Sequence, residues 1–535
     1  MIVKSFHRPP AISSKGMVAS PHPLATLAGL DILRDGGNAI DAAIATGAVL
    51  NVVLPSMTGL GGDLFLVTFS RKEGKVLALN GSGRAPSGIS AEAVLKLGHR
   101  TMPPRGILSV SVPGLINAWE EAIKRLGTMP LSKVLQPAIR YATDGFPVSP
   151  DLSSMMIQQR EILLKDAEAA RIFLKGGHPF QSGERLVQPE QARSLRIIAE
   201  GGREAFYKRK LAEAIVKTSE ALGGFFSLDD LTKYRSIWTE PVRVTYRDYD
   251  VYTPPPNSQA ITLLIALNLV EGFDLGSLGQ NSAEALHLLV EAKKLAFTDR
   301  DRFIADPDFV TIPVADLLSK ERARRRRSEI DRAQARPFAA LAAAADTIAL
   351  ATADAEGNWT SLIQSLYSPF GSGICIPGTG ILLHNRLMGL SLDPDHPNCL
   401  EGGKRPRHTL SPVLVLKDGL PFLAVGTRGA DGQIQTLLSL ITDVIDFGRD
   451  VQGALEAPRW LHGGRLPGED PEELRLEGGM HEEPREALRR KGHKVTIVPA
   501  FDYNMGYAQG IQRDPATGTL IGGADPRGEG SALGW

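Results

Sequence analysis

The stretch "DTIALATADAEGNWTSLIQSLY", from Asp346 to Tyr367, is strongly β-patterned. Its two runs, Thr347–Ala353 and Trp359–Leu366, are separated by "DAEGN", whose Asp, Gly and Asn are typical of a hairpin loop. The alanine-rich segment "FAALAAAAD" precedes the first run. The sequence therefore predicts two buried, paired strands, with Thr347 at the first strand position behind a loose segment.

A threonine at this junction meets a chemical need. An interior hydroxyl is a weak nucleophile, but a break between Asp346 and Thr347 would give Thr347 a free α-amine beside its own Oγ. Such an amine has a pKa of roughly 7.7–8.0, so part of it is a neutral base at physiological pH that can activate the hydroxyl. Most Asp-Thr pairs are only turn or strand-entry residues, so this pair needs support from the rest of the chain.

The composition of the 535-residue chain excludes several classes of partner. Lys+Arg and Asp+Glu balance at 60 each, which gives no overall field to attract nucleic acid or an anionic membrane. The N-terminus lacks the apolar core of a secretory signal, and no stretch reaches the roughly 18 apolar residues of a membrane span. We therefore expect a cytoplasmic protein with no nucleic-acid or membrane partner. The run Arg324–Arg327 is expected to be a solvated helix face, and Cys375 and Cys399 are too few for a disulfide framework.

The rest of the chain divides into a helix-rich first part and a β-rich last third that share one core. Helical spacing of apolar residues predicts helices over Ala25–Leu33 and Ala39–Val53, and a long helix from Ala283 to about Phe303. A strand is expected over Leu64–Phe69, after a glycine turn. The charged segment Asp316–Arg336, followed by alanine-rich sequence, indicates an exposed, mobile segment.

Ordered blocks along nearly the whole chain carry a resemblance to a known family. They include "GMVASPHPLATLAGLDILRDGGNAIDAAIA", "GLGGDLFLV", "LHLLVEAKKLAFTDRDRFIADPDF", "FGSGICIPGTGILLHN" and "KRPRHTLSPVLVLKDG". The chain resembles the γ-glutamyltranspeptidase family of N-terminal nucleophile hydrolases. The resemblance implies an α+β fold, a four-layer αββα sandwich, made as a proenzyme that cuts itself between Asp346 and Thr347. Its pieces, residues 1–346 and 347–535, would stay together as one intertwined domain, the first ending in a mobile arginine- and alanine-rich tail.

The same resemblance implies the chemistry. An amide substrate would acylate Thr347, and the acyl group would pass to water or to an acceptor amine, with no cofactor and no metal. Ser365 aligns with a family threonine whose hydroxyl hydrogen-bonds the nucleophile. In "GTRGADGQ", Gly429 and Ala430 take the two positions whose backbone N–H groups hold the oxyanion. Since Ala430 stands where the family has glycine, we expect it to serve only if its φ is negative.

Departures from the family pattern gather where the substrate would bind. Gly389 stands where the family has an acidic residue that holds the substrate's α-amino group, and Arg386 stands where a glutamine is usual. Arg84 lies two places later than the family arginine that grips the α-carboxylate. Such a pocket favours a carboxylate-bearing amide without an α-amino group over glutathione. The candidate substrate-binding residues are Arg84, Tyr367, Arg386, His408 and Thr409, with Arg407 as a further cation.

Three hypotheses remain open at this stage. At the level of the family, the chain is a self-cleaving threonine hydrolase of γ-glutamyl or related small amides. The alternative is an amidohydrolase of simpler amides, resembling the oxamate amidohydrolase branch, or a diverged acylase, in either case without efficient transpeptidation. The alternative from another class is an unprocessed binding or scaffold protein.

The expected partners are a small-molecule amide and the chain's own two pieces, and a homo-oligomer stays open. No metal is expected. The mixed segment "PDHPNC", Pro394–Cys399, has no second cluster with metal-site spacing and is interpreted as a loop. His287 lies on the predicted long helix and is interpreted as structural.

Overall fold

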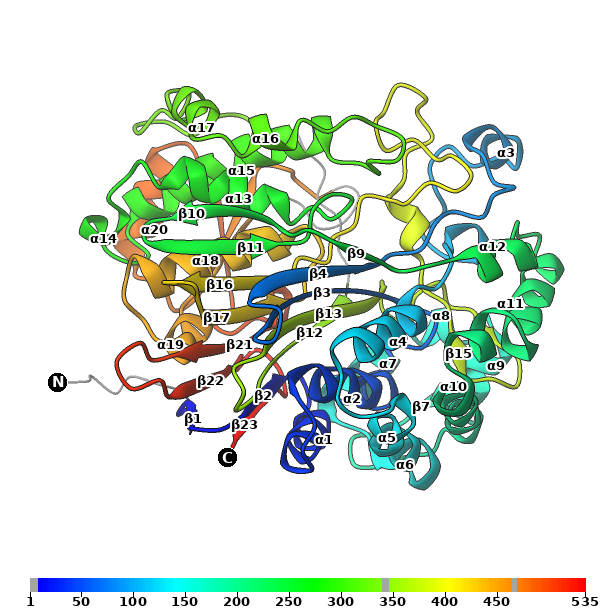
Figure 1. The fold of residues 1–535 in the computed structure, drawn as a ribbon. Coiled ribbons are helices and arrows are strands. Elements are labelled where there is room, and N and C mark those ends of the chain that lie inside the picture. The colour runs from blue at the N-terminus through cyan, green and yellow to red at the C-terminus, as the bar shows by residue number, and fades with distance from the viewer. Residues whose placement is uncertain (1–7, 339–345, 464–468) are drawn as a thin grey trace.

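Two antiparallel seven-stranded sheets form the centre of the molecule (Figure 1). The computed structural model describes residues 8–338, 346–463 and 469–535. In spatial order, the first sheet consists of β23 (Ser531–Gly534), β2 (Met17–Ser20), β12 (Asp346–Ala353), β13 (Trp359–Tyr367), β3 (Asp63–Ser70), β4 (Lys75–Gly81) and β9 (Ile237–Thr239). The second sheet consists of β1 (Ala11–Ser13), β22 (Leu520–Ala524), β21 (Ala508–Arg513), β17 (Leu420–Thr427), β16 (Val413–Lys417), β11 (Tyr249–Thr253) and β10 (Val242–Tyr246).

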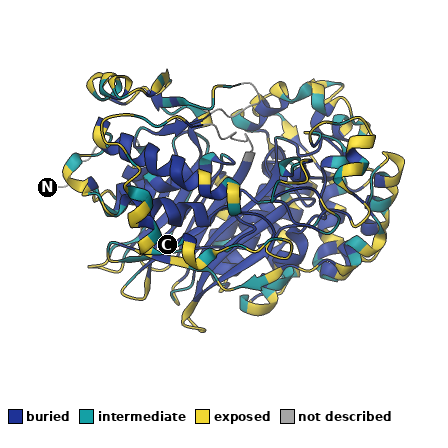
Figure 2. Cartoon of the chain, turned by 90° about the horizontal axis from the view of Figure 1, so that it is seen from above, coloured by how far each residue is buried: buried dark blue, intermediate teal, exposed yellow. Residues whose placement is uncertain are grey.

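The two sheets pack face to face through a buried apolar layer. Strands β12 and β13 of the first sheet contact β17 of the second. Val67, Ala351 and Trp359 from the first sheet cluster with Leu414 and Ile511 from the second. In Figure 2 the central strands are buried, and the exposed residues lie mainly at the periphery. The predicted hairpin of β12 and β13 is therefore confirmed as part of the innermost layer.

Helices cover the outer face of each sheet. Helices α2 (Ala39–Val53) and α4 (Leu115–Leu126) contact strands of the first sheet. Helices α13 (Ile261–Val270), α18 (Gly432–Ile445) and α19 (Val451–Glu456) contact strands of the second sheet. Figure 1 shows the two sets of helices on opposite sides of the paired sheets. The four-layer αββα sandwich predicted from the resemblance is confirmed.

Local sequence explains why the main helices begin where they do. Asn38 Oδ1 accepts hydrogen bonds from the backbone N–H groups of Ile40 and Asp41, and Asp41 Oδ2 accepts one from Asn38 N, which forms a capping box at the start of α2. Ser282 caps α15 (Ala283–Phe303) by accepting a hydrogen bond from Ala285 N. The helices predicted over Ala39–Val53 and from Ala283 to about Phe303 are confirmed within these bounds.

The remaining elements surround the sandwich. The other α-helices are α1 (Pro23–Arg34), α3 (Ala91–Lys96), α5 (Leu131–Val134), α6 (Gln136–Asp144), α7 (Pro150–Gln158), α8 (Arg160–Leu163), α9 (Ala167–Phe173), α10 (Pro189–Tyr207), α11 (Lys210–Ala221), α12 (Leu228–Lys233), α14 (Leu275–Leu278), α16 (Val314–Leu317), α17 (Lys320–Arg327) and α20 (Glu482–Arg490). The short 3₁₀ helices are η1 (Ile107–Ser109), η2 (Arg386–Gly389) and η3 (Tyr503–Met505). The minor strands are β5 (Phe146–Pro147), β6 (Leu174–Lys175), β7 (His178–Pro179), β8 (Arg185–Leu186), β14 (Cys375–Ile376), β15 (Ile381–Leu382), β18 (Trp460–His462), β19 (Glu473–Glu477) and β20 (Lys494–Val498).

The charged segment before Thr347 is more ordered in part than the sequence indicated. Helix α17 contains the arginine run, and Arg324 and Arg325 are exposed as predicted for a solvated face. Arg327 instead donates from Nε to Leu269 O at 2.8 Å and from Nη2 to Asn268 O at 2.9 Å, near the C-terminal end of α13. Part of the arginine run therefore anchors one helix to another. Residues 339–345, the alanine-rich part of the predicted mobile tail, lie outside the described residues.

No helix among residues 8–338, 346–463 and 469–535 is both long enough and apolar enough to span a bilayer. The two cysteines, Cys375 and Cys399, are buried and unpaired.

Candidate active site

Thr347 lies at an irregularity at the start of β12. Asp346 pairs with Tyr367 of β13 and Ile348 pairs with Gln364, so the register shifts across Thr347 as in a β-bulge. A bulge re-aims a side chain relative to the regular pleat, and bulges occur next to active sites. The Thr347 side chain is buried, and its Oγ1 lies 3.1 Å from Ser365 Oγ. The predicted nucleophile and its predicted hydroxyl partner are thus in hydrogen-bond contact.

Ser365 links the nucleophile to the neighbouring strands. Its Oγ accepts a hydrogen bond from Tyr367 N at 2.7 Å, which fixes the hydroxyl beneath the end of β13. On the other side, Ser365 stands directly opposite Asp63 in the pairing of β13 with β3. Ser365 therefore occupies the position between Thr347 and a buried carboxylate.

The predicted oxyanion turn connects β17 to α18. Gly429 has φ 120° and Ala430 has φ 48°. Among the described residues, the backbone N–H groups of Gly429 and Ala430 donate to no acceptor. Adjacent N–H groups without acceptors are what an oxyanion hole requires. The turn itself is held by the hydrogen bond from Gly432 N to Gly429 O and by the hydrogen bond from Gln259 Nε2 to Ala430 O.

Ala430 does not meet the condition of a negative φ that the sequence analysis set for its role in the turn. The residue lies in the left-handed region, which an alanine enters at a cost of roughly 1–2 kcal/mol. Its buried methyl group packs against the ring of Tyr367. The side chain that strains the turn therefore also forms part of the wall of the site.

Four of the five predicted substrate-binding residues come together beside Ser365. The Arg386 guanidinium stacks over the Tyr367 ring, with its carbon 4.1 Å from the ring centre. Arg386 Nη1 donates to Thr409 Oγ1 at 3.0 Å, and Arg386 Nε lies 3.3 Å from Asp63 Oδ2. His408 Nε2 lies 2.9 Å from the same Asp63 oxygen. Strands β3 and β13, helix η2 and the segment before β16 thus meet at one buried polar cluster.

Two members of this cluster, Asp63 and His384, were missed by the sequence analysis. His384 Nδ1 lies 3.0 Å from Asp63 Oδ2. Burial alone would raise the pKa of the Asp63 carboxyl, but contacts with His384 and His408 hold that pKa well below its usual range. Burial, reinforced by the nearby Arg386 charge, lowers the pKa of His408 to about 3. The available signal was an aspartate at the start of an otherwise apolar strand, "DLFLV", inside a block already noted for the family.

Arg84 is not part of the cluster. Its Nη1 donates to Gly403 O at 2.8 Å, and its guanidinium pairs with Asp308 and, at 3.7 Å, with Asp306. It lines a separate open cavity of about 750 Å³ together with Arg405. Two carboxylates already compensate its charge, so its contacts do not support the predicted role in gripping the substrate.

A second group of paired charged side chains lies near Tyr367. Arg407 Nη1 pairs with Asp301 at 2.9 Å, and Arg300 pairs with both Asp301 and Asp431. Burial, followed by repulsion from Arg300, lowers the pKa of Arg407. Arg407 is the more accessible of the two arginines, since its side chain is 18% exposed and that of Arg300 is fully buried. Gly389, at the end of η2, contributes no side chain at the place of the family's acidic residue.

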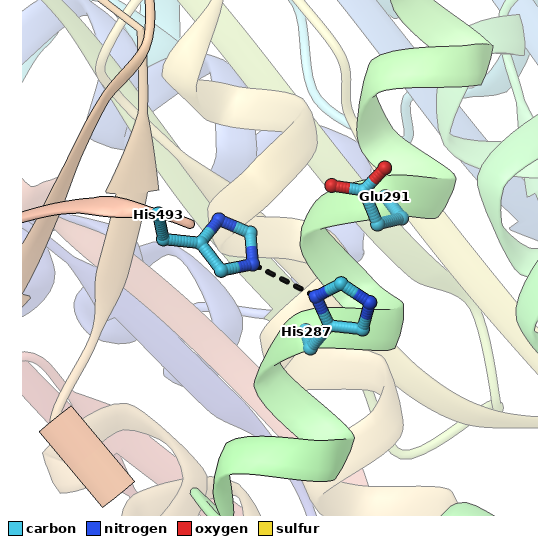
Figure 3. A group of neighbouring side chains, drawn as sticks. All are labelled: His287, Glu291 and His493. Carbon is cyan, nitrogen blue, oxygen red and sulfur yellow. Dashed lines mark hydrogen bonds between the residues drawn. The ribbon is translucent and has the colours of Figure 1, made fainter. Parts of the chain in front are cut away.

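His287 of α15, which the sequence indicated as structural, lies with Glu291 and His493 in a buried group of potential metal ligands (Figure 3). His287 Nδ1 lies 2.8 Å from His493 Nε2, and His287 Nε2 donates to Asp331 O at 2.7 Å. Lys294 donates to Glu291 Oε1 at 2.7 Å. The ligand atoms are thus engaged by protein groups, and the adjacent ammonium opposes a cation. We interpret the group as an anchor for the segment that precedes Thr347.

Comparisons with known proteins agree with this geometry. The family model described as gamma-glutamyltranspeptidase matches residues 25–535. The chain is 44% identical to the glutathione hydrolase-like YwrD proenzyme of Bacillus subtilis, over 98% of this chain and 99% of that protein. It is 35% identical to the oxamate amidohydrolase proenzyme of Klebsiella pneumoniae, over 98% of this chain and 99% of that protein. The crystal structure of cephalosporin acylase from Bacillus halodurans superposes with a TM-score of 0.92 at 38% identity, covering 100% of this chain and 98% of that one.

Proposed function

The chain belongs to the gamma-glutamyltranspeptidase family, and from this membership we propose that it is an autoprocessed amidohydrolase that uses Thr347 as its nucleophile. It cuts its own chain between Asp346 and Thr347 and then cleaves a small amide through an acyl-Thr347 ester. The observation that carries this proposal is the contact of 3.1 Å between Thr347 Oγ1 and Ser365 Oγ at the bulged start of β12. The names of the relatives, which describe proenzymes, support the processing step.

The chemistry follows from the newly exposed amine. The α-amine of Thr347 accepts the Oγ proton while Oγ attacks the amide carbonyl, and the negative oxygen is held by the N–H groups of Gly429 and Ala430. The proton passes to the leaving amine as the C–N bond breaks, which leaves an ester on Thr347. Water, deprotonated by the same α-amine, then attacks the ester, and the amine returns this proton to Thr347 Oγ as the acid is released. Ser365 holds Thr347 Oγ in line throughout.

The substrate class is proposed from the charges around Tyr367. Arg386 and Arg407 lie near this ring, and Gly389 removes the carboxylate that would pair with a substrate ammonium. An acyl group that carries a carboxylate and no α-amino group matches this field better than a γ-glutamyl group does. The relatives named as an oxamate amidohydrolase and a cephalosporin acylase agree with amides other than glutathione.

Hydrolysis of γ-glutamyl compounds is the second candidate. It is favoured by the 44% identity to the glutathione hydrolase-like relative. In this case the substrate's α-amino group would need an acceptor other than the side chain at position 389.

Processing is tested first. We expect the wild-type protein to migrate as two bands in denaturing electrophoresis and Thr347→Ala as one, because only the wild type can attack the bond after Asp346. Mass spectrometry of the smaller wild-type band should give a fragment that begins at Thr347. A single band in the active wild-type protein would contradict the mechanism. A single band in an inactive protein would favour the scaffold hypothesis.

The substrate class is tested with three p-nitroanilides that share one chain length. The γ-glutamyl compound carries a carboxylate and an ammonium, the glutaryl compound only the carboxylate, and the pentanoyl compound neither. We expect kcat/KM to be highest for the glutaryl compound, by about tenfold or more over either of the others, which corresponds to one charge interaction of about 1.4 kcal/mol. A γ-glutamyl compound that reacts fastest, with stimulation by glycylglycine, would favour the second candidate.

A further inference from the structure

The Asp63 carboxylate collects three N–H donors on one oxygen. His384 Nδ1, His408 Nε2 and Arg386 Nε all lie within 3.3 Å of Asp63 Oδ2. In His408 the other ring nitrogen, Nδ1, faces Leu410 N, which can only donate. His408 therefore donates from Nε2 and accepts at Nδ1, which makes it the neutral tautomer. Its low pKa, caused first by burial, agrees with this assignment.

His384 lies against the same oxygen. Its Nδ1 lies 3.0 Å from Asp63 Oδ2, and its Nε2 lies 2.8 Å from Ser111 O and 3.1 Å from Ser111 Oγ. The ring is fully buried against the carboxylate.

The Arg386 guanidinium is only partly used within this cluster. Its Nε lies 3.3 Å from Asp63 Oδ2, and its Nη1 donates to Thr409 Oγ1 at 3.0 Å. Among the described residues, Arg386 Nη2 and Asp63 Oδ1 are buried polar atoms without a hydrogen-bond partner. An unused, buried guanidinium donor in the cluster beside Ser365 is a site for an anion.

We propose that Asp63 is a positioning residue for substrate specificity, acting through Arg386. Asp63 fixes Arg386 Nε, Thr409 fixes Nη1, and Nη2 is left for the carboxylate of the acyl group. This inference rests on the proposed function and adds to it the residues that set the carboxylate preference.

The first test measures kinetics with glutaryl-p-nitroanilide and inhibition by glutarate. In Asp63→Asn we expect KM and the glutarate inhibition constant to rise about tenfold or more, while kcat changes by less than about threefold. The reason is that Arg386 loses its anchor, whereas Thr347, Ser365 and the oxyanion turn keep theirs. A fall in kcat with unchanged KM and unchanged glutarate inhibition would overturn the inference.

Asp525→Asn is the matched control. Asp525 is also a fully buried aspartate that pairs with arginines, but its partners, Arg459 and Arg527, differ from those of Asp63. We expect this variant to lose stability but to keep the wild-type KM and glutarate inhibition. Equal rises in KM in both variants would show a general effect of buried charge and would overturn the role of Asp63.

The processing experiment separates failure of this inference from failure of the proposed function. Denaturing electrophoresis of the wild type gives one band if the chain is uncut, and that result would refute the proposed function. Two bands together with an unchanged KM and an unchanged glutarate inhibition constant in Asp63→Asn would refute the role of Asp63 alone, so the two failures are distinguishable.

Discussion

At the scale of single residues, the region around Thr347 is marked by backbone strain. Tyr367, Phe370 and Ala430 have φ values of 77°, 58° and 48°, which residues other than glycine rarely adopt. Residues in such conformations cluster at active sites, where the surrounding structure holds them. Here Tyr367 and Ala430, whose backbone conformations are both strained, pack against each other. The backbone strain therefore lies where we propose that the acyl group binds.

The two positions of the oxyanion turn should respond differently to substitution. Ala430→Gly gains roughly 1–2 kcal/mol by relief of the left-handed alanine, and loses about 0.8 kcal/mol of methyl burial and roughly 0.4–1 kcal/mol of chain entropy. We therefore expect a change of less than about 1 kcal/mol in the free energy of unfolding, measured by denaturant titration, and a processed, active enzyme.

Gly429→Ala is the contrasting variant. A Cβ at Gly429 would have room, since its nearest neighbour would be 3.9 Å away, but φ 120° is strained for alanine. The turn should shift and move one oxyanion donor, which lowers kcat by about 10²–10³ with a smaller effect on KM. If Gly429→Ala keeps the wild-type kcat, the turn does not hold the oxyanion.

The residues of the site were predictable to different degrees. Thr347 and Ser365 belong to one hairpin, so local pattern and family resemblance together place them. Asp63 and His384 are separated by 321 positions, and their hydrogen bond depends on how β3 and the segment between β15 and η2 are brought together. Single-sequence reasoning has no local signal for such a pair. Arg84 was assigned by its place in a motif, but Asp306 and Asp308 compete for its charge.

At the scale of elements, predictions succeeded where the local signal and the tertiary environment agree. Helix α2 is buried along its whole length and has a capping box, so apolar composition and cap chemistry point to the same bounds. Helix α17 shows the opposite case. Its high content of charged residues indicates a solvated segment. Arg327 nevertheless donates hydrogen bonds to two backbone carbonyl groups near the end of α13.

The bulge at Thr347 is also a tertiary feature. Strand β12 pairs with β13 along its whole length but with β2 only through Ala351, Thr352 and Ala353. The first residues of β12 are thus supported on one side only, and the register can shift across Thr347. Alternation of apolar residues predicts a strand here, but it does not predict where the pairing slips.

At the scale of the whole molecule, the two pieces on either side of the proposed cut each contribute strands to both sheets. In the first sheet, strands from the two pieces alternate at the pairs β23–β2, β2–β12 and β13–β3. In the second sheet they meet at β1–β22 and β16–β11. Cutting the chain before Thr347 removes one peptide bond and none of these ladders, so separation of the pieces requires both sheets to open.

This interweaving predicts how the processed protein unfolds. Because folded pieces cannot part without losing shared sheets and core, the processed wild type should elute from a sizing column with both pieces in equal amounts and unfold in one cooperative transition. Its unfolding now yields two molecules, so its Tm should rise with protein concentration, whereas the Tm of uncut Thr347→Ala should not. Calorimetry across a hundredfold range of concentration distinguishes the two. A processed protein that sheds its smaller piece in dilute buffer, or that melts in two steps, would mean that the sheets are not held together as the strand order requires.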